Sequence, residues 1–322
     1  MKGTVKDTIG LFKEAFRDFN DDDCPRMAAA LSYYTVFALP PLLILILLML
    51  GWVFEPQEVE LALHTQFRGL MGDSGAEGVK TILAQAESPG AKRGVAAVLG
   101  IGALLLGATG AFLQLQSALN RAWEVEPDRS QGGIKNFILK RVLSLGMVLG
   151  IAFLLLVSLA MSAAVTAMGG AIGRILPGLS EPLGYAITLV FSFAMVTLLF
   201  AAIFKVLPDA RIAWRDVWVG AVVTALLFVI GKFLIGLYLG RSDPGQAYGA
   251  AGSLAVVLVW IYYSAMIVLF GAEFTQTWAV RRGGGIAPET GAKLMHDEAP
   301  GADESPDAVA AAEAARKRAE SR

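Results

Sequence analysis

Long apolar segments alternate with short polar ones along most of this chain. Six segments are long enough to cross a bilayer, and they cover about residues 27–54, 94–119, 142–168, 182–204, 217–240 and 250–280. About 20 residues, rising 1.5 Å each, span the ~30 Å hydrocarbon core. Because lipid offers the backbone no hydrogen-bond partners, such segments must be helical. The pattern predicts an all-α, polytopic membrane protein with six transmembrane helices.

The positive charges between the predicted spans are distributed unevenly. Segments on the side of the N-terminus carry 20 of the lysines and arginines, and segments on the opposite side carry 6. Loops rich in lysine and arginine stay on the cytoplasmic side of a membrane. Both termini are therefore predicted to lie inside, in an N-in/C-in topology.

Residues 1–26 precede the first span and form a cytoplasmic amphipathic segment. Apolar residues recur in it at helical spacing: Val5, Ile9, Phe12, Phe16 and Phe19. A short flanking helix of this kind lies either in the lipid headgroup region or against the cytoplasmic loops.

Two other segments outside the spans carry a structural signal. Residues 55–93 contain two amphipathic patterns separated by Gly-Asp-Ser-Gly at 72–75, which predicts two short helices at the external mouth. Residues 281–322 are rich in Gly, Ala, Pro and charge, and they contain almost no large apolar side chains. Such a segment cannot bury enough surface to offset its ordering entropy, so we expect a disordered cytoplasmic tail. The six-helix membrane domain covers residues 27–280.

Composition excludes several classes of function. The net charge of −1 gives no basic excess that would suggest nucleic acid as a partner. The single Cys24 excludes an intrachain disulfide, and two histidines are too few for a His-rich metal site. The sequence contains no nucleotide-binding G-x-x-x-x-G-K-[ST], no zinc-hydrolase H-E-x-x-H and no G-x-S-x-G. We therefore expect no ATPase, no metal, no cofactor and no enzymatic activity.

The first span carries the strongest candidate for a substrate path. Pro40-Pro41 lies near its middle, where two missing donors predict a kink or a short break. Four hydroxyl-bearing residues precede the prolines: Ser32, Tyr33, Tyr34 and Thr35. Broken helices near the midplane often build transport sites, although a kink that only improves packing is the alternative.

Two charged residues lie inside the spans. Lys232 interrupts the fifth span and Glu273 the sixth. Glu273 lies near the cytoplasmic face, and we expect it to meet a cation there: Arg26, Arg121 or Lys205. Glu273 and Arg121 are therefore interpreted as structural charges. Lys232 lies about two helical turns deeper, where it faces a polar interior or a lipid phosphate, or extends along the helix to the surface.

Polar and small residues mark two further helix faces. Gln114 and Asn120 close the second span, where they either line a path or cap the helix. Gly236 and Gly240 form a G-x-x-x-G in the fifth span, which predicts close helix packing.

The membrane region as a whole resembles the YihY/BrkB-like (virulence factor BrkB) family of bacterial inner-membrane proteins. The resemblance rests on these segments: Ala30–Tyr34, Pro40-Pro41, Ser117–Trp123, Leu207–Asp209, Trp214–Ala221, Gly231-Lys232, Tyr248-Gly249, Trp260–Tyr263 and Gly271–Glu273. It implies a multi-pass protein of the bacterial inner membrane that moves lipids or other envelope components. The family formerly carried a ribonuclease BN name, which the residues do not support because the membrane core contains no histidine.

The leading hypothesis is a transporter or translocator of lipids or envelope components, without its own ATPase. Its path would lie between the first-span residues named above, Lys232, Gln114 and Asn120. The alternatives are a non-transporting membrane scaffold for envelope assembly and an intramembrane enzyme. Membrane lipids are the expected partners, a lipid or a small molecule is the expected substrate, and homo-oligomerisation is left open.

Overall fold

The protein is described by a computed structural model, which covers residues 5–50, 55–86, 110–128, 180–242, 252–282, 285–289 and 291–295. Most of these residues are helical. The long helices are α1 (Val5–Asp21), α2 (Cys24–Leu50), α3 (Pro56–Ala86), α6 (Ser180–Val206), α7 (Trp214–Ser242) and α9 (Gly252–Arg281). A further helical segment covers 110–122.

Three of the described helices are long and apolar enough to cross a membrane. The membrane-compatible stretches are Leu189–Val206 in α6, Trp214–Tyr238 in α7 and Leu254–Arg281 in α9. The predicted span 142–168 and most of 94–119 lie outside the described residues. The helical fold class is confirmed, and the six-span count stays a prediction.

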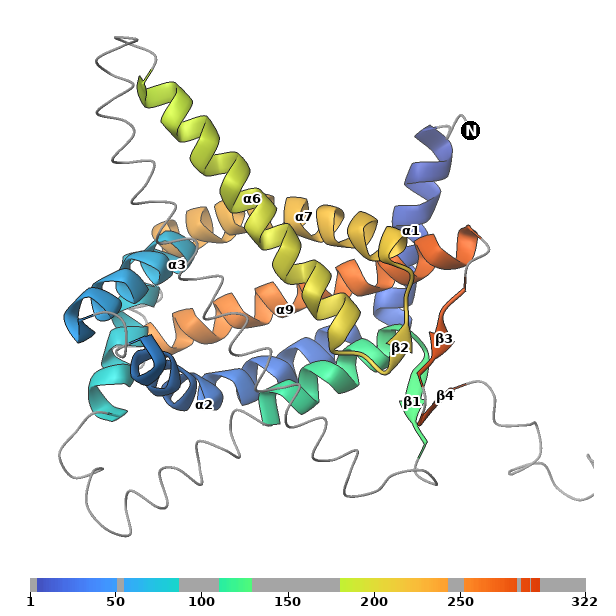
Figure 1. The fold of residues 1–322 in the computed structure, drawn as a ribbon, viewed down its shortest axis with the longest axis horizontal. Helices are drawn as coiled ribbons and strands as arrows, with labels where there is room; N and C mark the ends of the chain where they lie inside the picture. The colour runs from blue at the N-terminus through green and yellow to red at the C-terminus, as the bar shows by residue number, and fades with distance from the viewer. Residues whose placement is uncertain are drawn as a thin grey trace, which may run out of the picture.

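Helix α9 is the centre of the bundle. It packs against α1, α2, α3 and α7, and α6 packs against α7, running obliquely across it (Figure 1). The largest apolar core joins α9 to the start of α2, the segment 110–122 and the end of α6. The end of α9 that carries Arg281 therefore lies beside α1, which places the N-terminal segment and the end of the last span on the same side of the bundle.

Helices α7 and α9 approach closely through two reciprocal pairs of glycine and threonine. A Cβ atom at Gly220 would lie 1.8 Å from Oγ1 of Thr275, and one at Gly271 would lie 1.9 Å from Oγ1 of Thr224. Each threonine hydroxyl donates to the glycine carbonyl one turn earlier in its own helix, at 2.7 Å in α7 and 2.6 Å in α9. The hydroxyls are thus satisfied without water, and the two backbones can meet.

The other small-residue motif has no packing role among the described residues. Gly236 is exposed, and a Cβ there would meet nothing within 4 Å. Gly236 therefore makes no close crossing with the described helices, whose close approach lies about three to four turns away along α7, at Gly220 and Thr224. The packing role of the Gly236 motif stays a prediction.

The two predicted helix breaks have different outcomes. The break at 72–75 is confirmed, because Gly72 has a φ of 76° inside α3, a left-handed value that favours glycine. Helix α2, in contrast, continues across Pro40-Pro41, so the expected short break does not occur, and the kink that was its alternative stays a prediction. Proline lacks a donor but leaves the rest of the helical hydrogen bonds in place.

Part of the expected disordered tail is ordered. Strand β3 (Ala287–Pro288) pairs antiparallel with β2 (Ala210–Arg211), and β4 (Ala292–Leu294) pairs antiparallel with β1 (Val125–Pro127). We call residues 285–289 and 291–295 the strap. The prediction of disorder is wrong for the strap, because its backbone finds partners in two loops far away in sequence that composition alone could not reveal.

Candidate functional site

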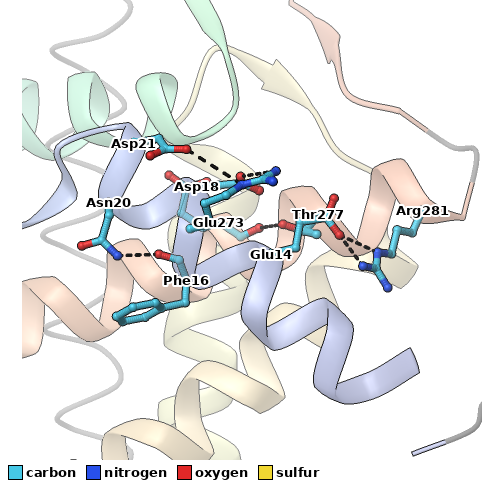
Figure 2. Close-up of polar contacts among 9 residues, drawn as sticks. Glu14, Phe16, Asp18, Asn20, Asp21, Glu273, Thr277 and Arg281 are labelled. Carbon is cyan, nitrogen blue, oxygen red and sulfur yellow. Dashed lines mark hydrogen bonds and ion pairs between the residues drawn. The ribbon is translucent and has the colours of Figure 1, made fainter. Parts of the chain in front are cut away.

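The most deeply buried carboxylate of a described candidate span belongs to Glu273. Its side chain is 1% exposed and lies on α9 where that helix packs against the start of α2. The thiol of Cys24, the first residue of α2, donates to Oε1 of Glu273 across 3.4 Å. One turn further along α9, the Thr277 hydroxyl donates to the Glu273 carbonyl at 2.8 Å (Figure 2). The carboxylate is therefore held at a helix–helix contact.

No cation among the described residues pairs with Glu273. Arg121 pairs instead with Asp22 at 3.1 Å, and Lys205 donates to the Ile212 carbonyl at 2.6 Å. Arg26 binds the neighbouring Asp23 at 2.8 Å. Our prediction that Glu273 meets a cation of this side is wrong for these three candidates, since each is directed to a nearer acceptor.

A second acidic group lies close to this carboxylate at the turn between α1 and α2. Burial raises the pKa of the Asp22 carboxyl above its ordinary value of 3.8, although the Arg121 guanidinium beside it lowers the pKa. The carboxylates of Glu124 and Asp18 also raise it. Arg121 is thus the cation that pairs with Asp22 in this acidic region, and its interpretation as a structural charge stays a prediction.

Asn120 proves to be part of a fixed corner between the segment 110–122 and the loop after α6. Its amide donates to Asp209 Oδ2 at 2.9 Å, and its carbonyl oxygen accepts from the Asp209 backbone at 2.8 Å. Gln116, one turn earlier on the same face, donates to Asp209 Oδ1 at 3.2 Å. Gln114 lies on a different face of this helix. The structure thus places Asn120 in a hydrogen-bonded corner with the loop after α6, and a role on a substrate path stays a prediction.

The hydroxyl groups before the prolines do not converge. Ser32 is buried and donates to the Ala29 carbonyl of its own helix at 2.8 Å. Tyr33 and Tyr34 are 58% and 43% exposed, and their rings meet edge to face. Thr35 and Pro40 are half-buried on the same helix.

Lys232 is also separate from these groups. Its side chain is exposed on α7, which packs equally against α6 and α9, whereas α2 packs mainly against α9. Its neighbour Gly231 touches Tyr263 and Ile267 of α9, whereas Gly220 lies opposite Thr275, next to Glu273. The two charged residues of the spans are therefore about ten residues, or nearly three helical turns, apart along the bundle, somewhat more than the two turns predicted.

A separate hollow lies at the other end of α2. An open pocket of about 250 Å³ is lined by Leu43 and the two halves of α3, with His64, Glu60 and Lys80 among its lining residues. Leu43 is 19 residues from Cys24, about 28 Å along a helix. This pocket is therefore distinct from the Glu273 contact.

A family model described as virulence factor BrkB matches residues 15–293. The chain belongs to this family.

Curated relatives agree with the BrkB assignment. A UPF0761 membrane protein of Azotobacter vinelandii (strain DJ) is 31% identical over 285 residues, covering 85% of this chain and 64% of the relative. One from Pseudomonas aeruginosa (strain LESB58) is 34% identical and covers 79% of this chain and 59% of the relative. A third, from Psychromonas ingrahamii, is 29% identical and covers 85% of this chain and 89% of the relative. The chain thus spans less than two thirds of the length of the first two relatives. No solved structure matches it.

Sequence reasoning on this BrkB family member missed several residues that the fold brings together. Cys24 was considered only for disulfides, and nothing in its sequence neighbourhood indicates a partner 249 positions away. Asp209 likewise carried no signal of its own. The close crossing of α7 and α9 had a readable signal, because Gly-x-x-x-Thr occurs in both helices, at Gly220 and at Gly271.

Proposed function

We propose that this BrkB family protein is a membrane transporter that translocates lipids or related envelope components, without an ATPase of its own. Glu273 is the residue that exchanges a proton or cation during the transport cycle. The observation that carries the proposal is the burial of this carboxylate in a candidate span, against a thiol and apart from the described cations. Intramembrane ionisable residues are costly and mark ion pathways and proton relays.

The chemistry of the contact supports an exchangeable group. A structural carboxylate in a low-dielectric site is best stabilised by a cation with good geometry. A cysteine thiol is only a weak donor, so it holds Glu273 in place without neutralising it. Because Cys24 begins α2 and Glu273 belongs to α9, a small shift between the two helices would expose the carboxylate.

Reconstitution into vesicles tests the proposal. Proteoliposomes are assayed for translocation of a fluorescent (NBD-labelled) phosphatidylglycerol by dithionite quenching, and for proton flux with an internal pH dye. We expect both signals above those of protein-free vesicles, and a several-fold slower rate for Glu273→Gln. Asp216→Asn is the matched control, because it also removes a buried carboxylate, 3% exposed, at the start of α7.

The possible outcomes separate the two parts of the proposal. If the wild-type protein moves neither lipid nor protons faster than protein-free vesicles, the transport function is wrong and a scaffold role is favoured. If the wild-type protein is active and Glu273→Gln equals it, transport stands and the role of Glu273 is wrong.

A further inference from the structure

Helix α1 lies across the end of the bundle and packs there through one face. Figure 1 shows it running transverse to α2 and α9, next to the end of α9 that carries Arg281. Its contact face consists of Leu11, Ala15 and Phe19, which are 5%, 0% and 7% exposed. These residues meet Phe274 and neighbouring side chains of α9 and α7. A helix that crosses the spans at one end runs along the membrane surface rather than through it.

A second apolar stripe of α1 is left largely exposed by the part of the chain that the structure describes. Ile9 and Phe16 are 63% and 59% exposed. Phe12 lies at the edge of the contact face, where it is 36% exposed and one side of its ring packs 5.0 Å from the ring of Phe274. At 100° per residue these three side chains adjoin one another around the helix, directly beside the packed face. A helix that only packed on the bundle would place its large apolar residues on the contact face alone, so the exposed stripe requires a second apolar surface.

The charged residues of α1 are segregated around the helix. Lys13 and Arg17 follow the exposed stripe on the side away from the bundle, and both are exposed. Asp18 and Glu14 lie on the opposite side of the packed face. Glu14 binds the guanidinium of Arg281, with Nε at 2.8 Å (Figure 2).

Of the two cations, Arg17 also makes exposed pairs within α1, with Asp18 at 3.4 Å and Asp21 at 3.9 Å. Pairs of this kind contribute about 0–1 kcal/mol and are easily exchanged for another anion. The order around the helix is therefore packed face, exposed apolar stripe, cations and then acids.

We infer that α1 is a membrane-surface helix whose stripe of Ile9, Phe12 and Phe16 inserts into the adjacent lipid leaflet. In this position Lys13 and Arg17 lie level with the lipid phosphates. Amphipathic helices of this type bind at the boundary of headgroups and acyl chains, with their basic residues toward anionic lipid. The acidic side turns toward Arg281 and water, so the helix presents its cations and not its acids to the lipid phosphates. The inference is independent of whether the protein transports.

Site-directed spin labelling tests the position of α1. Labels are placed at Ile9→Cys, Phe16→Cys and Asp21→Cys, one at a time in a Cys24→Ala background. The full chain is reconstituted in nanodiscs of phosphatidylethanolamine and phosphatidylglycerol. We expect labels at 9 and 16 to be accessible to oxygen and several-fold less accessible to a water-soluble nickel complex than the label at 21. Asp21 is the matched control because it lies on the same helix, with its side chain 72% exposed.

The remaining outcomes overturn the inference. Nickel accessibility at 9 and 16 equal to that at 21 would place the stripe in water. Protection from both oxygen and nickel would mean that protein, a partner or a second copy, covers it. A charge reversal tests the contact of Lys13 and Arg17 with the lipid phosphates. In the protein labelled at Phe16→Cys, the double substitution Lys13→Glu and Arg17→Glu should raise the nickel accessibility of the label toward that of position 21. An unchanged accessibility would refute the contact with the phosphates.

Discussion

At the scale of single residues, the contact between Glu273 and Cys24 replaces an ion pair expected from the sequence. Because no described cation pairs with Glu273, replacing its carboxylate with a neutral amide leaves no unpaired charge in the described bundle. We therefore predict that Glu273→Gln keeps or raises the melting temperature of the purified protein in detergent, even if transport is lost. A fall of several degrees would show that a cation compensates Glu273 in the full chain.

Asn120 gives a second prediction at this scale. It is 3% exposed and exchanges two hydrogen bonds with Asp209, one of them with a carboxylate. Removing them leaves buried polar groups unsatisfied, so Asn120→Ala should lower the free energy of unfolding by about 2–3 kcal/mol. Gln114→Ala, on another face of the same helix, should change it by less than about 0.5 kcal/mol. Equal effects in denaturant titrations would contradict the assignment of Asn120 to a fixed corner.

At the scale of elements, the crossing of α7 and α9 is specified by absent side chains. Gly220→Ala and Gly271→Ala would each place a methyl group within 2 Å of a threonine hydroxyl on the other helix. Because both neighbours belong to packed helices, we expect each variant to lose about 2–3 kcal/mol or more, or to fail to fold.

Gly236 is the matched control for this crossing. It lies on α7 like Gly220, but a Cβ there meets no atom within 4 Å. Alanine has the higher helix propensity, so Gly236→Ala should be neutral or stabilising by up to about 1 kcal/mol. A loss of stability or of folded yield at Gly236 would indicate that other parts of the chain, or a second copy, pack on that face.

At the scale of the whole molecule, the strap joins the segment after α9 to two loops far away in sequence. Besides the strand pairing, Lys293 forms a cross-strand ion pair with Glu126 at 3.0 Å. We predict that a chain ending after Arg282 melts at a lower temperature than one ending after Met295. The longer truncated chain should match the full-length protein, because the composition beyond Met295 predicts no packed structure. Equal melting temperatures for the two truncations would show that the strap adds no stability.

Topology provides the other test at this scale. The ion pair between Glu14 and Arg281 places α1 and the end of α9 on one side, as an even number of spans requires. In intact cells, cysteines at Asp73 and Asp243 should react with an impermeant thiol reagent, and a cysteine at Arg129 should not. The Cys24→Ala background removes the native thiol. Labelling at Arg129, with none at Asp73 and Asp243, would show that the topology is the reverse of the predicted one.

The sequence determined the features that depend on local pattern. The length of the apolar segments predicted that they are helices, because in lipid a single segment can satisfy its backbone hydrogen bonds only as a helix. The break at Gly72 was readable because it falls at the first glycine of a Gly-Asp-Ser-Gly turn sequence. The segment from Ala30 to Glu273 carried the family resemblance, which the family model confirms.

Only the tertiary structure decided which residues meet across long separations. It gave Glu273 a thiol and not a cation, because the three candidate cations each had a closer acceptor. It ordered the strap, since backbone pairing partners at Val125 and Ala210 lie outside any local window. It also divided α1 into a packed face and an exposed stripe. A hydrophobic period identifies an apolar face, but the neighbouring elements determine how much of that face is covered.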